Sequence, residues 1–125
     1  MRVLVVNDAP LERAIFRRYA LRAGCTIAGE APDADAALTA LDETAADLVV
    51  LDGRIPPSGC LEALVRLREL RPGLPVLVIV ALEEVELLRA ALREGAAGAL
   101  ARPLLPSQIF EQLRLVARRA AGENE

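Results

Sequence analysis

Short runs of uninterrupted apolar residues recur along the chain, and each is followed by a segment whose apolar residues are spaced as in a helix. Continuous apolar runs rich in β-branched residues are typical of strands buried on both faces of a parallel sheet. One segment, residues 26–30, has a weaker and alternating pattern, which fits a strand at a sheet edge. We therefore expect strands at residues 3–6, 26–30, 47–52, 76–81 and 99–101.

The segments between these strands predict helices. Pro10 suits the first turn of a helix, because its missing N–H needs no partner there, and Gly24 suits the position after a helix ends. A second helix is expected at residues 33–43, and a third begins near Leu61. A fourth ends at Gly95, and the last begins at Pro106. The face of the first helix expected to point inward consists of Leu11, Ala14, Ile15, Tyr19 and Ala23.

This alternation of strand and helix predicts a parallel sheet with helices on both faces, joined by right-handed crossovers. At 125 residues the chain is long enough for one domain with a sizeable core. We expect that domain over residues 1–121 and a polar tail over residues 122–125. In such a sheet every strand ends at the same edge, which is where ligands bind.

Composition excludes several function classes. Hydrophobic residues make up 54% of the chain, but no apolar run is long enough to span a bilayer, and residues 3–6 are too short for a signal peptide. We expect a cytoplasmic protein without a membrane partner. The net charge of −3 gives no broad electrostatic case for direct nucleic-acid binding. The chain has no His and two distant Cys, so a Cys/His zinc site and a Ser-His or Cys-His nucleophile are excluded.

Ionic or polar residues follow three of the predicted strands. Asn7 and Asp8 follow the first strand, Asp52 ends the third, and Arg102 follows the fifth, so all should meet at one edge. Any one of them alone is more typical of a strand-to-loop turn. Together, two carboxylates and an amide can bind Mg²⁺, which needs only one or two protein carboxylates. A carboxylate nucleophile, a metal and a fixed cation are the parts that phosphoryl transfer requires.

With these residues, the sequence resembles the receiver domain of bacterial two-component response regulators over essentially its whole length. The fold this implies is α/β: a flavodoxin-like, doubly wound five-stranded parallel sheet, (βα)5, with strand order 2-1-3-4-5. The matching segments are residues 3–8, 47–59, 75–81 and 95–104.

The resemblance implies roles for the residues at the carboxyl edge. An aspartate at the position of Asp52 accepts a phosphoryl group from a histidine kinase. Residues at the positions of Asn7 and Asp8 hold Mg²⁺, together with the backbone carbonyl at Arg54. Asn7 replaces an acidic residue, so the predicted metal site has one charge fewer and Asn7 contributes weakly or through water.

Further positions match or depart from the family pattern. Arg102 stands where a lysine contacts the phosphoryl group, in a chain whose 15 basic residues are all Arg. Pro103 matches a proline that usually follows a cis peptide bond. Val80 replaces the Ser or Thr whose hydroxyl bonds the phosphoryl oxygen, and Ala99 replaces the switch aromatic. The usual relay from the phosphoryl group to the surface therefore lacks both of its parts.

Two interpretations remain open from these residues. The first is a receiver that accepts phosphate on Asp52 with Mg²⁺ and signals through protein contacts, without being an enzyme in its own right. The second is a pseudo-receiver that binds partners without phosphorylation. The retained Asp8, Asp52 and Arg102 favour the first, while Val80 and Ala99 favour the second. A flavodoxin-like or nucleotide-binding function is disfavoured, because the loop after residues 3–6 has no glycine.

The resemblance also implies partners: a histidine kinase or phosphotransfer protein, and a downstream protein or fused effector domain. The expected contact surface consists of the fourth helix, fifth strand and last helix, and it could also join two copies of the chain. Leu87, Ala99 and Ile109 are expected on or near that surface. Leu87 is expected to be exposed, because the inward stripe of its helix is Val85, Leu88, Ala91 and Leu92.

Overall fold

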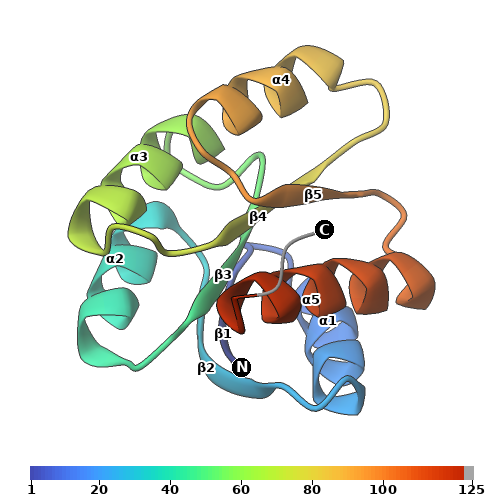
Figure 1. The fold of residues 1–125 in the computed structure, drawn as a ribbon. Coiled ribbons are helices and arrows are strands. Elements are labelled where there is room, and N and C mark those ends of the chain that lie inside the picture. The colour runs from blue at the N-terminus through green and yellow to red at the C-terminus, as the bar shows by residue number, and fades with distance from the viewer. Residues whose placement is uncertain (123–125) are drawn as a thin grey trace.

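The computed structural model describes residues 1–122, and five strands alternate with five helices in this part of the chain (Figure 1). The last three residues of the expected polar tail lie outside it. The strands are β1 (Arg2–Val6), β2 (Thr26–Ala31), β3 (Leu48–Asp52), β4 (Val76–Val80) and β5 (Gly98–Ala101). The helices are α1 (Pro10–Arg22), α2 (Ala34–Glu43), α3 (Cys60–Leu70), α4 (Val85–Arg93) and α5 (Pro106–Ala120).

The strands form one parallel sheet in the order β2-β1-β3-β4-β5. This confirms the predicted doubly wound (βα)5 architecture, and it confirms that the weakly patterned strand β2 lies at an edge. Strands β3 and β4 are buried at every residue, as their unbroken apolar runs predicted. Asp52 is the last residue of β3, so a carboxylate ends the central strand of the sheet.

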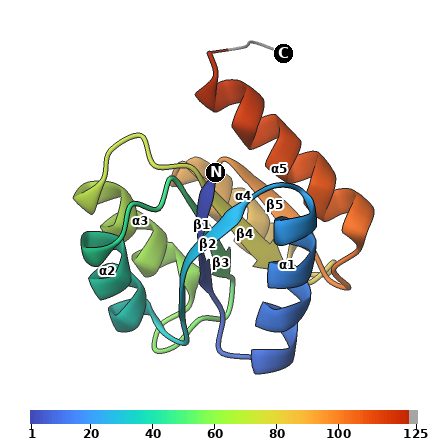
Figure 2. The ribbon, with the colours of Figure 1, turned by 90° about the horizontal axis from the view of Figure 1, so that it is seen from below.

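Helices cover both faces of the sheet. Helices α1 and α5 lie side by side on one face, while α2, α3 and α4 cover the other (Figures 1 and 2). Two buried clusters result, one on each side of the sheet. An edge-to-face contact between Tyr19 of α1 and Phe110 of α5 joins the two helices of the smaller cluster. No helix of the described residues is both long and apolar enough to cross a membrane.

The inward face predicted for α1 was wrong in part. Phe16 and Ala20 are its buried residues, whereas Leu11 is 75% exposed. The helix packs against α5 as well as the sheet, so its buried stripe is set by two neighbours and is centred on Phe16. Leu11 lies in the first turn, near the carboxyl edge of the sheet, where it lines a cleft described below.

The predicted orientation of α4 was also wrong in part, because Leu88 and Ala91 do face the core. Leu87 is partly buried and packs against the core, while Val85 and Leu92 are about half exposed. The reason lies in the loop after β3. A Cβ atom on Gly53 would lie 3.0 Å from the Cδ2 atom of Leu87, so the missing side chain of the glycine makes room for this leucine. Ile109 of α5 is likewise fully buried and is not a surface residue.

Candidate functional site

Asp52 lies at the carboxyl end of β3, and its side chain is almost fully buried. Its Oδ1 atom accepts a hydrogen bond from the backbone N–H of Arg54 at 3.2 Å. The same atom accepts a second hydrogen bond from Nη2 of Arg102 at 2.6 Å. Both hydrogen bonds go to Oδ1, so Oδ2 has no hydrogen-bond partner among the described residues.

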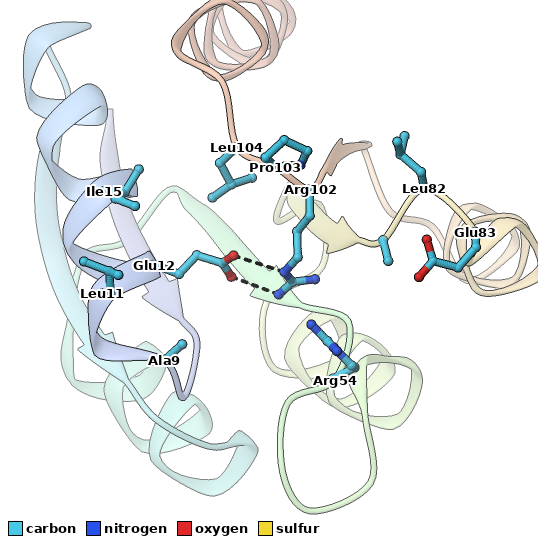
Figure 3. Close-up of a pocket in the computed structure, with 11 residues that line it drawn as sticks. Ala9, Leu11, Glu12, Ile15, Arg54, Leu82, Glu83, Arg102, Pro103 and Leu104 are labelled. Carbon is cyan, nitrogen blue, oxygen red and sulfur yellow. Dashed lines mark hydrogen bonds and ion pairs between the residues drawn. The ribbon is translucent and has the colours of Figure 1, made fainter.

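Arg102 follows β5, and its guanidinium connects two carboxylates. Its Nε donates to Oε2 of Glu12 at 3.0 Å, and its Nη2 donates to Oε1 of Glu12 at 2.9 Å. This is a fork-to-fork contact of the kind that fixes both partners (Figure 3). Nη2 also reaches Asp52. The third nitrogen, Nη1, is buried without a hydrogen-bond partner among the described residues.

These contacts determine the charge state of Arg102. Burial by itself lowers the pKa of its guanidinium, but the hydrogen bonds and charges of Glu12 and Asp52 outweigh that effect and raise the pKa above its ordinary value. The side chain is therefore a permanent cation at the edge of the sheet. Its buried Nη1 atom has no hydrogen-bond partner among the described residues.

Asn7 is buried at the end of β1 and orders the loop into α1. Its Oδ1 atom accepts from the backbone N–H of Ala9 at 2.8 Å, and its Nδ2 donates to Oε1 of Glu12 at 2.6 Å. Its backbone carbonyl accepts from Nη1 of Arg13. Asp8, next in the chain, is exposed. The structure thus brings Asn7, Asp52 and Arg102 into one network, and Asp8 lies beside it with its carboxylate facing solvent.

Glu12 is the member of this network that the sequence reasoning missed. It lies in the first turn of α1, and it contacts Arg102 across 90 positions of sequence. A signal was available: a helix that begins at Pro10 puts residue 12 at the carboxyl edge of the sheet, beside Asn7. An acidic residue in a first turn is so common as a helix-dipole partner that this position did not stand out.

A cleft of about 740 Å³ opens beside the network. Its polar side chains are those of Glu12, Arg54, Glu83 and Arg102 (Figure 3). Leu11 and Leu82 line it from opposite sides and are mostly exposed to solvent. The apolar lining also includes Ala9, Ile15, Ala81, Pro103 and Leu104.

The oxygen donors at this edge suit a hard cation of the Mg²⁺ type. The candidate donors are the carboxylate of Asp52, the exposed carboxylate of Asp8 and the backbone carbonyl of Arg54. Mg²⁺ is commonly held by one or two carboxylates and keeps several waters. The described residues contain no group of three or more acidic, Cys or His side chains arranged to hold a metal. The donor set therefore fits a cation that retains much of its hydration. It does not fit a cation whose ligands all come from the protein.

Val80 and Ala99, which depart from the expected relay residues, lie in the neighbouring strands β4 and β5. Val80 ends β4 and is buried, and Ala99 is partly buried in β5. The peptide bond between Arg102 and Pro103 is cis, as the resemblance implied. A second cis bond, between Pro56 and Pro57 in the loop after β3, was not predicted.

Cys60 begins α3 behind Asp52 and provides a pH-dependent test of this packing. Burial, with the nearby charges of Asp52 and Glu84, raises the pKa of its thiol from 9.0 to about 11. The unfolded state therefore loses this proton first as the pH rises, and stability must fall. We expect the free energy of unfolding to decrease by about 1 kcal/mol between about pH 8 and pH 10.

Urea unfolding at a series of pH values measures this effect. A Cys60→Ala variant should lack this part of the pH dependence, while Cys25, whose thiol pKa burial also raises, remains in both proteins. Equal slopes of stability against pH in the two proteins would contradict the assignment.

Comparison with known proteins identifies the family. Residues 3–114 match the response regulator receiver domain. The chain belongs to this family. Chemotaxis protein CheY of Thermotoga maritima is 27% identical over 117 residues, which cover 94% of this chain and 98% of CheY. Transcriptional regulatory protein TcrA of Mycobacterium tuberculosis is 35% identical over 119 residues, covering 95% of this chain and 47% of TcrA.

Other relatives of this receiver are longer than it is. It is 34% identical to a protein-glutamate methylesterase/protein-glutamine glutaminase of Caulobacter vibrioides, and it spans 38% of that protein. Among solved structures, the receiver domain of NtrX from Brucella abortus is 29% identical, with a TM-score of 0.81 and coverage of 98% and 99%. A receiver domain protein from Clostridium thermocellum reaches a TM-score of 0.88 over 96% of both chains at 17% identity, a likeness of fold alone.

Proposed function

We propose that this receiver accepts a phosphoryl group on Asp52 and signals through protein contacts. One observation carries the proposal: Oδ2 of Asp52 has no hydrogen-bond partner among the described residues, and the guanidinium that binds Oδ1 still has an unpartnered, buried N–H. A carboxylate supplies the nucleophile, and the N–H of Arg102 supplies a donor for the transferred phosphoryl oxygens. Positioning and charge stabilisation of this kind are the main requirements of phosphoryl transfer.

The reaction needs no separate general base. A carboxylate oxygen of Asp52 forms a bond to phosphorus, and the bond from phosphorus to the donor breaks. With acetyl phosphate as the donor, acetate leaves with the bonding electron pair, and no proton has to move. With a histidine kinase or phosphotransfer protein as the donor, a phosphohistidine nitrogen leaves instead.

Mg²⁺ would be held by Asp8, Asp52 and the backbone carbonyl of Arg54. When bound, it would neutralise charge on the phosphoryl oxygens. Asn7 would contribute weakly or through water, because its Oδ1 atom already accepts from the backbone of Ala9. The carboxylate of Asp8 is free to turn toward a cation, since it is exposed.

Output would run through contacts between proteins and not through the usual hydroxyl-aromatic relay. Val80 is apolar and buried, so it offers no hydroxyl to a phosphoryl oxygen. The surface formed by α4, β5 and α5 is the proposed contact region for a downstream protein, a fused effector domain or a second copy of the chain. Val85 and Leu92, both about half exposed, are the apolar residues that α4 offers there in place of Leu87.

A second function has its own supporting observation. Asp52 is already neutralised by Arg102 at 2.6 Å, which is an arrangement that a pseudo-receiver could keep permanently. In that case the chain would bind its partner constitutively, and the carboxylates at the carboxyl edge of the sheet would have only a structural role. The two functions differ in whether phosphate is incorporated.

Intact-protein mass after incubation with acetyl phosphate and Mg²⁺ separates them. We expect one phosphoryl group on the wild type and none on an Asp52→Asn variant. Asp47→Asn is the matched control, because Asp47 precedes the same strand at its opposite, amino-terminal end. No mass increase in the wild type at saturating Mg²⁺ would overturn the phosphoacceptor proposal and leave the pseudo-receiver.

A further inference from the structure

Two departures from the family pattern, an amide at position 7 and an arginine at position 102, meet at a third residue. Glu12 accepts hydrogen bonds from both side chains: from Nδ2 of Asn7 at 2.6 Å, and from Nε and Nη2 of Arg102 at 3.0 and 2.9 Å. An aspartate in place of Asn7 would present a second carboxylate to Glu12 and would repel it. The amide at position 7 and the carboxylate at position 12 are therefore complementary, and the negative charge absent from position 7 is present at position 12.

This network leaves Arg102 with little freedom. Glu12 is itself fixed by Asn7, which in turn is fixed by the backbone N–H of Ala9. The fork-to-fork contact uses two of the three guanidinium nitrogens, Nε and Nη2, and Nη2 also donates a hydrogen bond to Asp52. Only Nη1 has no partner among the described residues, and it points away from Glu12 in Figure 3.

We propose that Glu12 is a positioning residue that competes with the phosphoryl group for Arg102. The proposal rests on the proposed function. A phosphoryl group on Asp52 carries several oxygens and would be bound best by a guanidinium that presents a pair of parallel N–H groups. Glu12 occupies the Nε and Nη2 pair, so a phosphoryl group can use that pair only if Arg102 gives up its hydrogen bonds to Glu12. The carboxylate at position 12 thereby opposes phosphorylation and holds Arg102 ready near Asp52.

The matched pair of variants is Glu12→Gln and Glu83→Gln. Both remove one negative charge from residues that line the same cleft, but Glu83 makes no contact with Arg102 (Figure 3). The probe is beryllium fluoride, a stable mimic of a phosphoryl group, titrated at saturating Mg²⁺ and followed by fluorine NMR.

We expect Glu12→Gln to bind the mimic about tenfold more tightly than the wild type, because a charge-assisted bidentate contact no longer competes. Glu83→Gln should stay within about twofold of the wild type, because an exposed charge that has no ion-pair partner among the described residues has a small, screened effect. A variant that merely loosened the fold would bind more weakly. Unchanged or weaker binding by Glu12→Gln, or an equal gain in Glu83→Gln, would overturn the proposal.

A second readout does not depend on phosphorylation. In protein with nitrogen-15 arginine, the Nε–H of Arg102, assigned by its loss in Arg102→Lys, should exchange slowly with water in the wild type and faster in Glu12→Gln. Equal exchange would overturn the positioning role.

Acetyl phosphate separates this proposal from the phosphoacceptor function. If the wild type incorporates phosphate and Glu12→Gln incorporates no more than the wild type, the role of Glu12 is overturned and the phosphoacceptor function is not. Incorporation by Glu12→Gln but not by the wild type supports the role of Glu12, and it overturns the phosphoacceptor function of the native protein. If neither protein incorporates phosphate or binds the mimic, both proposals fail.

Discussion

Replacing Gly53 with alanine is expected to lower the free energy of unfolding by about 3 kcal/mol, a large effect for one methyl group. An added Cβ atom would lie 2.7 Å from the backbone oxygen of Ile79 and 3.0 Å from Leu87. The carbonyl of Ile79 accepts the backbone N–H of Gly53 at 2.8 Å, so the backbone cannot move away without breaking this bond. The ends of β3 and β4 would have to separate directly beside Asp52.

Chemical denaturation of the two proteins measures this loss. The matched control is Gly29→Ala in the edge strand β2, where the nearest atom to an added Cβ is Cδ1 of Leu4 at 3.4 Å, an ordinary contact. We expect the control to change stability by less than about 1 kcal/mol. If both variants lose equal stability, the contact with Ile79 is not what limits position 53.

An Arg102→Met variant is expected to lose about 2 kcal/mol of stability at neutral pH. Methionine retains most of the apolar length of the side chain but leaves the carboxylates of Asp52 and Glu12 without their cation. Removal of one partner from a fully buried ion pair costs roughly 3–5 kcal/mol. The expected loss is smaller here because Arg102 and Glu12 both retain about a fifth of their side-chain exposure.

A double-mutant cycle with Asp52→Asn tests the origin of that loss. Asparagine carries no charge, so Arg102→Met should cost clearly less stability in the Asp52→Asn background than in the wild type. Arg102→Lys is expected to lose less than Arg102→Met, because a lysine ammonium can satisfy one carboxylate but not both in this geometry. Equal losses in the two backgrounds would show that the arginine contributes by packing and not by charge.

The outline of the fold followed from the sequence because its signals are local and repeated. Unbroken apolar runs identified the central strands, and the alternating pattern of residues 26–30 identified the edge strand β2. The strand order came from the resemblance to receiver domains, and the structure has that order. The meeting of Asn7, Asp52 and Arg102 at one edge followed from parallel-strand geometry alone.

The orientation of two helices could not be predicted in the same way. Four apolar residues of α4 are candidates to face the core: Val85, Leu87, Leu88 and Leu92. Periodicity alone does not determine which of them are buried. Leu87 packs inward because Gly53, 34 positions away in the sequence, leaves room for its side chain. In α1, packing against α5 determined which residues are buried.

The sequence by itself determined that this is a five-unit parallel α/β domain with a carboxylate at the end of its central strand. Hydrophobic periodicity and turn residues act over a few positions, so they can be read directly from the chain. The tertiary structure alone decided which charges meet. Glu12 and Arg102 are 90 positions apart, and their contact depends on the angle at which α1 leaves β1 and on the place where β5 ends. Because a charged contact needs an accuracy of a fraction of an ångström, no pattern in the sequence could specify it.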